Sequence, residues 1–159
     1  MGRARHHRLV PERVVVLGPG GAGKSTFARA FGAAHDLPVT ELDALFWRPG
    51  PTPTPADEWA ARQHELVAGE RWVIDGDLGA YDILEPRLRR ADTVILIDLP
   101  TWRCAARALR RGGGNVEFWR WLLTWRRRYR PRLLREIAEQ APTAVLHRPR
   151  TPGQIAALV

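Results

Sequence analysis

One short segment near the N-terminus has the residue types of a phosphate-binding loop. Residues 18–25 read Gly-Pro-Gly-Gly-Ala-Gly-Lys-Ser and fulfil every position of the pattern G-x-x-x-x-G-K-[ST]. Glycines let the backbone curl until several N–H groups point at one phosphate group. The Lys24 amine would reach the β- and γ-phosphates, and the Ser25 hydroxyl would bind Mg²⁺. The sequence therefore predicts a site for ATP or GTP with Mg²⁺. The residues expected to contact the nucleotide are Gly18, Gly20, Gly21, Ala22, Gly23, Lys24, Ser25 and Thr26.

The basic residues of the chain are almost all of one kind. Of its 25 basic residues, 24 are arginines, and the single lysine is Lys24. Because every other one of these basic residues is an arginine, the lysine at position 24 indicates that a guanidinium group cannot replace the amine there. The formal net charge of +8 favours polyanionic partners, whether nucleic acid, anionic lipid or phosphorylated small molecules.

The residues around the loop favour transfer of a phosphoryl group over hydrolysis. The chain lacks the N-K-x-D motif by which GTPases read guanine. Hydrolases of this class commonly place a glutamate after the aspartate that ends a strand, as a base for water. Here Asp75 is followed by Gly76, and Asp98 by a leucine. We therefore expect a bound acceptor to receive the phosphoryl group.

Three aspartates are candidates for the remaining roles. Asp43 follows the second predicted strand, which is short, and could orient an acceptor hydroxyl and accept its proton; the alternative is a helix-capping or loop aspartate. Asp75 ends another strand and is the preferred partner for Mg²⁺, because Gly76 leaves room for a ligand beside it. Asp98 competes with Asp75 for that role. The predicted metal ligands are thus Ser25 and Asp75.

Alternating strands and helices would position these residues. The order predicts an α/β fold with a five-stranded parallel sheet and helices on both faces, in which the carboxyl ends of the strands line one crevice. Strands are predicted at 14–17, 39–42, 72–75, 93–98 and 143–147, and helices at 25–35, 55–68, 82–90, 101–111, 116–140 and 152–158. Residues 48–55 contain too many prolines for either element.

Length and composition indicate one globular domain. The chain has 159 residues, 45% hydrophobic and 26% charged, and its single cysteine excludes an internal disulfide or a multi-cysteine zinc site. We expect a basic tail at 1–12 and one P-loop domain at 13–159. No apolar run reaches the length of a membrane helix or a signal peptide, so the expected location is cytoplasmic.

Four segments together resemble the bacterial DNA topology modulation proteins, small P-loop proteins related to adenylate and shikimate kinases. They are residues 18–25, 42–50, 72–77 and 91–100. The resemblance runs from about Arg13 to Val159. It implies the P-loop NTPase fold of the nucleoside and shikimate kinases, an ATP site at 18–26 and a mobile lid. It implies no defined reaction, because the family name describes an effect on DNA topology.

The chain departs from that family pattern twice. The lid insert shrinks to Gly112–Asn115, which leaves a shortened lid region at 103–130. Adenylate kinases also place an arginine after the Asp-Gly that follows the third strand, where this chain has Asp77-Leu78-Gly79. The second departure argues against AMP as the acceptor. The segment 43–71 should form the acceptor pocket, with Trp47 and Trp59 as apolar walls and Arg48 as an anion contact; for Trp47 the alternative is a packing residue.

Eleven arginines and one acid, Glu117, lie between residues 103 and 135. In a kinase, several of them would close over the triphosphate; Arg107 and Arg111 are the first candidates, with Arg126 and Arg130 in second place. In a nucleic-acid binder they would contact backbone phosphates. In a third interpretation they are a solvated surface. The leading hypothesis is a kinase that uses Lys24, Asp43, Arg107 and Arg111 to transfer the γ-phosphoryl group of Mg·ATP to an unidentified small molecule. The alternative is a nucleotide-dependent nucleic-acid-binding or regulatory protein that affects DNA topology.

Overall fold

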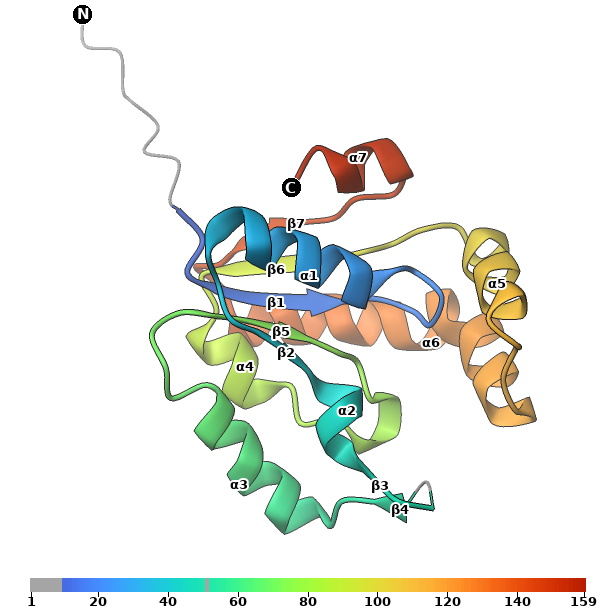
Figure 1. Ribbon diagram of the computed structural model, residues 1–159, viewed down its shortest axis with the longest axis horizontal. Helices are drawn as coiled ribbons and strands as arrows, with labels where there is room; N and C mark the ends of the chain where they lie inside the picture. Colours follow the sequence, from blue (N-terminus) through green and yellow to red (C-terminus); the bar gives the residue numbers. More distant parts are fainter. Residues whose placement is uncertain (1–9, 51) are drawn as a thin grey trace, which may run out of the picture.

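A five-stranded parallel sheet forms the centre of the protein (Figure 1). The computed structural model describes residues 10–50 and 52–159. In spatial order the strands are β2 (Val39–Glu41), β5 (Trp72–Asp75), β1 (Arg13–Leu17), β6 (Thr93–Leu96) and β7 (Val145–His147). All neighbouring strands pair in parallel. The predicted parallel sheet is therefore confirmed.

Helices cover both faces of this sheet, as predicted. Figure 1 shows α1 on one face and α4 and α6 on the other, while α5 and the start of α6 extend to one side. The helices are α1 (Lys24–His35), α2 (Leu42–Phe46), α3 (Ala56–Leu66), α4 (Glu85–Arg90), α5 (Thr101–Arg110), α6 (Val116–Gln140) and α7 (Pro152–Ala156), with a 3₁₀ turn η1 (Gly79–Tyr81).

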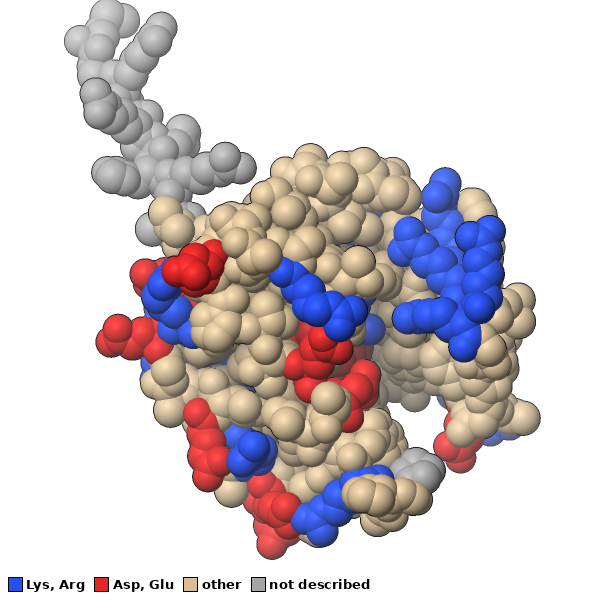
Figure 2. Space-filling model, viewed as in Figure 1, with Lys and Arg blue, Asp and Glu red and all other residues tan. Residues whose placement is uncertain are grey.

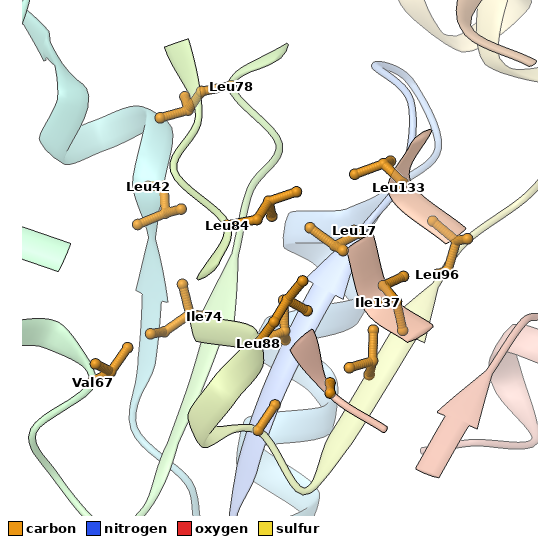
Figure 3. Close-up of a cluster of buried hydrophobic side chains, with 14 of the residues drawn as sticks. Leu17, Leu42, Val67, Ile74, Leu78, Leu84, Leu88, Leu96, Leu133 and Ile137 are labelled. Atoms are coloured by element: carbon orange, nitrogen blue, oxygen red, sulfur yellow. The ribbon is translucent and has the colours of Figure 1, made fainter. Parts of the chain in front are cut away.

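Strand β1 packs apolar side chains into both layers of the core. Val14 and Val16 point to the α1 side, whereas Val15 and Leu17 point to the other. Successive side chains of a strand alternate between faces, so a sheet covered on both sides needs an uninterrupted apolar run. Figure 3 shows the second layer, where Leu17 lies among leucine and isoleucine side chains of β6, α4 and α6.

The segment after β2 differs from the prediction. The strand ends at Glu41, and the short helix α2 begins at Leu42. Residues 48–55 were expected to form neither helix nor strand, and this prediction was wrong, because β3 (Trp47–Arg48) pairs antiparallel with β4 (Thr52–Pro53). β3 and β4 form a sheet of two strands, so both are edge strands. A proline, which lacks an N–H donor, is tolerated in an edge strand.

A short connection joins α5 to α6. Gly112 and Gly113 have φ angles of 99° and 74°, which favour glycine. The Gly113 N–H donates to the Ala108 oxygen at 2.9 Å, and the Asn115 side chain accepts from the Phe118 N–H at 2.8 Å. The connection is therefore a capped turn. Helix α6 continues through Pro131, and Figure 1 shows it changing direction along its length, as an internal proline predicts.

Two expectations concern the rest of the chain. The basic tail expected at 1–12 falls mostly on residues 1–9, which lie outside the described residues. Among the helices of the described ranges, none has both the length and the apolar character that crossing a bilayer demands.

Candidate functional site

The loop between β1 and α1 is the predicted phosphate loop. It follows Leu17 at the centre of the sheet, and α1 begins at Lys24. Gly21 and Gly23 have φ angles of 77° and 87°. A Cβ atom at Gly21 would lie 2.3 Å from the backbone oxygen of Cys104 in α5. Both the backbone conformation and the lack of space therefore require glycine at position 21.

The N-terminal end of α1 completes an anion site. The N-cap is Gly23, and no side chain caps the first N–H groups of the helix. Such N–H groups carry the positive end of the helix dipole. Because the loop curls over this end, a phosphate group there meets backbone donors from two directions.

Lys24 and Ser25 begin α1 beside the end of β5. The Lys24 Nζ donates to the Pro19 oxygen at 3.2 Å, which holds the amine across the loop. The Ser25 Oγ donates to Asp75 Oδ2 at 2.6 Å. Strand pairing produces this contact, because Val16 of β1 lies opposite Asp75 of β5. The sheet register thus brings the two predicted metal ligands together.

Asp75 is a buried carboxylate with spare hydrogen-bonding capacity. Its exposed fraction is 3%, and among the described residues its Oδ1 has no hydrogen-bond partner. Burial raises the pKa of Asp75, while Lys24 and the Ser25 hydrogen bond oppose that rise. A hydroxyl and a carboxylate are hard oxygen donors, and Mg²⁺ at a phosphate site needs only one or two protein ligands. The residues present therefore fit a magnesium ion.

Asp43 lies at the same edge of the sheet. It is the second residue of α2 and its side chain is exposed. Its charge and that of Glu41 raise the pKa of Asp75, so the three carboxyl groups lie within electrostatic reach of one another. The carboxyl ends of β2 and β5 therefore bring Asp43 to the edge of the sheet where Asp75 meets Ser25.

Arg107 connects α5 to the phosphate loop. Its guanidinium donates to the Ala22 oxygen at 3.0 Å. Arg107 and Arg111, the two arginines expected at the lid, both line a cavity of about 540 Å³ together with the loop. The rest of the lining comes from α1, α5 and the C-terminal residues: Thr26, Phe27, Ala30, Arg110, Pro152, Ile155, Ala156 and Val159. Figure 2 shows the basic side chains of this side gathered over α5.

Asp98, the competing candidate for the metal, is already paired. Its side chain is fully buried, and it contacts Arg126 at 3.7 Å, Arg130 at 3.4 Å and Arg148 at 2.6 Å. Three arginines already compensate the charge of this carboxylate, so a metal ion is not required to stabilise it. The pairs tie α6 and the residues after β7 to the residues after β6, so Arg126 and Arg130 fasten α6 to this end of the sheet. Sequence reasoning missed Arg148, although its position after the last strand was a usable signal.

A second buried ion pair supports the edge beside β5. The Arg87 side chain is fully buried and donates to both carboxylate oxygens of Asp82, at 2.8 and 2.9 Å, and to Gln63 at 2.7 Å. It also donates to the Gly76 oxygen at 3.3 Å. None of these residues was among the predicted site residues. The sequence signal that could have indicated this ion pair is Arg87, a charged residue next to Leu88 on the buried side of a helix.

The two tryptophans expected as acceptor walls lie in different environments. Trp47 is 41% exposed, but Trp59 is 1% exposed and packs against Phe46, so Trp59 belongs to the core and forms no wall. Arg48 makes an ion pair with Glu58 and therefore has an anionic partner within the protein. Both departures arise because α3 folds back on the segment that follows β2.

Comparisons with known proteins give structural likeness alone. No family model and no curated protein matches the sequence. A gluconokinase from Sinorhizobium meliloti 1021 shares 24% identity over 96% of this chain and 89% of its own, with a TM-score of 0.58. The shikimate kinase of Bacteroides thetaiotaomicron has 19% identity, coverage of 93% and 94%, and a TM-score of 0.57. The shikimate kinase of Acinetobacter baumannii, solved with shikimate, has 18% identity, coverage of 92% and 88%, and a TM-score of 0.61. The chain therefore has the P-loop fold of the shikimate kinases and gluconokinases.

Proposed function

We propose that this protein is a small-molecule kinase that transfers the γ-phosphoryl group of ATP to a hydroxyl group. One observation carries the proposal: the phosphate loop gathers Lys24, the Ser25–Asp75 pair and Arg107 around a single anion site. A cavity large enough for a nucleoside adjoins that site. The P-loop kinase fold supports the same conclusion.

The loop and the cavity would bind different parts of the nucleotide. The triphosphate would lie on the loop and the N-terminal end of α1, with Lys24 at the β- and γ-phosphates. The base would enter the cavity between α1, α5 and α7. Ser25 and Asp75 would hold Mg²⁺, which would neutralise charge on the phosphates when bound.

The transfer step needs an oxygen nucleophile and a base. The acceptor hydroxyl oxygen attacks the γ-phosphorus, the bond to the β,γ-bridging oxygen breaks, and ADP leaves. The hydroxyl proton passes to the carboxylate of Asp43, which is exposed at the edge of the sheet. Arg107 and Arg111 would stabilise the negative charge that spreads over the transferred group. Closure would come from movement of α5 and the first turns of α6, which precede the contacts of Arg126 and Arg130 with Asp98, because the turn between the two helices is short.

A second hypothesis, nucleotide-dependent binding of nucleic acid, rests only on the resemblance of four segments to the DNA topology modulation proteins, for which no family model or curated protein gives evidence. The positions of the arginines favour it less. Arg107, Arg110 and Arg111 line the nucleotide cavity, and Arg126 and Arg130 pair with Asp98. Three of these arginines therefore line the cavity and two have a carboxylate partner within the protein, which leaves fewer of them to contact a duplex. A duplex-binding role would show as affinity that falls steeply with salt and is independent of nucleotide.

The test is a screen for ATP-dependent phosphorylation of small hydroxyl compounds, read by mass spectrometry. Lys24→Ala should weaken the affinity for ATP by at least about tenfold, as measured by calorimetry, because it removes a charged contact. Lys24→Arg should lose nearly as much, since the planar guanidinium does not fit the curled loop. Arg103→Ala, on the exposed side of α5, is the control. Unchanged ATP affinity in both Lys24 variants would contradict the proposal.

A further inference from the structure

Three guanidinium groups converge on one buried carboxylate just after β6. The carboxylate belongs to Asp98, whose side chain is fully buried. Its oxygens lie 3.7, 3.4 and 2.6 Å from side-chain nitrogens of Arg126, Arg130 and Arg148. These four residues form the Asp98 cluster. They come from the residues after β6, from α6 and from the residues after β7, so the sheet and α6 together hold three cations around one point.

The Asp98 cluster carries more positive than negative charge. Three arginines and one aspartate give a formal surplus of +2, and within residues 10–50 and 52–159 none of these arginines forms an ion pair with another acid. Like charges this close repel one another, and partly buried guanidinium groups are screened less than fully exposed ones. An additional anion would relieve that repulsion.

The three arginines keep hydrogen-bond donors for such an anion. A guanidinium group has five N–H donors in a planar fork. Arg148 donates to Asp98 from Nε at 3.0 Å and from Nη2 at 2.6 Å, whereas Arg130 donates from Nη1 alone, at 3.4 and 3.5 Å. Arg126, at 3.7 Å, is beyond hydrogen-bond distance. The side chains of Arg126, Arg130 and Arg148 are 38%, 25% and 27% exposed, so a solute can reach them.

The Asp98 cluster begins beside the phosphate loop but lies outside the nucleotide cavity. Asp98 directly follows Ile97, whose backbone oxygen is 2.5 Å from the place where a Cβ atom on Gly18 would lie. Gly18 is the first residue of the phosphate loop. None of the four described residues of the cluster lines the cavity of about 540 Å³. A ligand of the cluster would therefore bind near the ATP site without occupying that cavity.

We propose that the Asp98 cluster is a second anion site, which binds a phosphate group through Arg126, Arg130 and Arg148. A phosphate monoester carries about −1.5 to −2 charges at pH 7, which matches the surplus of the cluster. Planar guanidinium groups also fit phosphate oxygens in pairs. A carboxylate, or one phosphodiester of a nucleic-acid backbone, carries a single charge and would leave one cation without a partner. The inference goes beyond the proposed kinase function, because phosphate binding here requires no phosphoryl transfer.

The first experiment titrates inorganic phosphate into the protein by calorimetry, with the phosphate loop saturated by Mg²⁺ and the non-hydrolysable analogue β,γ-imido-ATP. We expect saturable binding that strengthens as pH rises through the second pKa of phosphate, and much weaker binding of acetate. Arg126→Ala and Arg148→Ala should each weaken the affinity for phosphate roughly 10- to 100-fold, because each removes a charged donor. Either change leaves Asp98 two arginine partners, and chemical unfolding checks that both variants are folded.

Arg103→Ala is the matched control for this titration. It removes the same charge from the exposed side of α5, outside the cluster, and should bind phosphate as the parent does. Equal affinity for phosphate in all three variants, or no binding in the parent, would overturn the site. Loss of affinity for β,γ-imido-ATP in both cluster variants would assign the arginines to the phosphates of the nucleotide and overturn a second site. Tighter binding of a DNA duplex than of phosphate, lost in Arg126→Ala, would overturn it in favour of nucleic acid.

The second experiment separates two sources of the phosphate group, the acceptor and a free effector. ATP-dependent phosphorylation is compared for matched pairs such as glucose 6-phosphate and glucose, with and without inorganic phosphate. Preference for the phosphorylated member, with its KM raised roughly 10- to 100-fold by Arg126→Ala and unchanged by Arg103→Ala, identifies the acceptor. Preference for the unphosphorylated member, at a rate that free phosphate changes in the parent but not in Arg126→Ala, identifies an effector. If Arg126→Ala alters neither that KM nor the response to free phosphate, the assignment is overturned.

Discussion

The Arg107 guanidinium lies 3.0 Å from the backbone oxygen of Ala22, so a hydrogen bond joins α5 directly to the phosphate loop. The same guanidinium is 3.1 Å from the place where a Cβ on Gly23 would lie. Movement of α5 would therefore change the charge next to the proposed triphosphate site. The first prediction concerns this contact.

Arg107→Ala should lower phosphoryl transfer, and it should also lower the release of phosphate from ATP when no acceptor is present. Both reactions pass through the same charged transition state, and one charged donor is worth roughly 10²–10³-fold in rate. Steady-state phosphate release with and without acceptor measures both. Arg103→Ala, whose guanidinium stacks on the exposed Trp102 ring at 4.8 Å, should match the parent. If the parent shows no release, or the variant releases phosphate at the parental rate, the arginines of α5 are not a catalytic lid.

Asp43 and Asp75 should give separable defects. Asp43→Asn should spare Mg·ATP affinity and lower the transfer rate roughly 10²–10⁴-fold, because the base is lost. Asp75→Asn should weaken the dependence of ATP binding on Mg²⁺, because one ligand is lost. Calorimetry across a magnesium titration, together with single-turnover rates, separates the two. Exchanged phenotypes would reverse the assignment of base and metal ligand.

The charge on Asp77 should make stability depend on pH. Burial raises the pKa of Asp77 above its ordinary value of 3.8, and the neighbouring charge of Asp82 raises it further. The folded protein then binds this proton more tightly than the unfolded chain, so its contribution to stability falls as pH rises from the ordinary value through the raised pKa.

Asp77→Asn should therefore raise the free energy of unfolding at neutral pH, and the gain should vanish below the ordinary aspartate pKa, where the parental carboxyl is neutral in both states. Urea unfolding at a series of pH values measures the difference. Glu70→Gln, at an exposed carboxylate, is the control and should show no comparable gain. A gain that is the same at every pH would contradict the electrostatic cause.

Arg87→Ala should be strongly destabilising. The change leaves Asp82, whose side chain is 3% exposed, with an uncompensated buried charge. Breaking a buried pair in this way costs about 3–5 kcal/mol. Chemical unfolding measures the loss, and Arg89→Ala, on the exposed side of the same helix, should cost less than about 1 kcal/mol. The double variant Arg87→Met with Asp82→Leu should recover much of the stability; a loss equal to that of Arg87→Ala would argue against the buried charge as the cause.

The amino-acid sequence by itself determined the sheet and the phosphate loop. Both depend on signals that lie within a few residues: an apolar run such as Val14–Leu17, followed at once by glycines and Lys24. A parallel sheet then places every strand end at one edge, so Asp43 and Asp75 could be assigned to the site before their contacts were known. Their catalytic roles stay predictions.

Only the tertiary structure decided which charged and aromatic side chains remain available there. Asp75 ends β5 and Asp98 lies just after β6, the strands on either side of β1, yet Asp98 meets Arg148 from a segment 50 residues away. Trp47 and Trp59 are twelve positions apart in one predicted pocket segment, and the packing of α3 exposes the first and buries the second. The wall that α7 contributes to the nucleotide cavity likewise depends on the last strand pairing beside β6. Such contacts join residues far apart along the chain, and local patterns of hydrophobicity and charge contain no record of them.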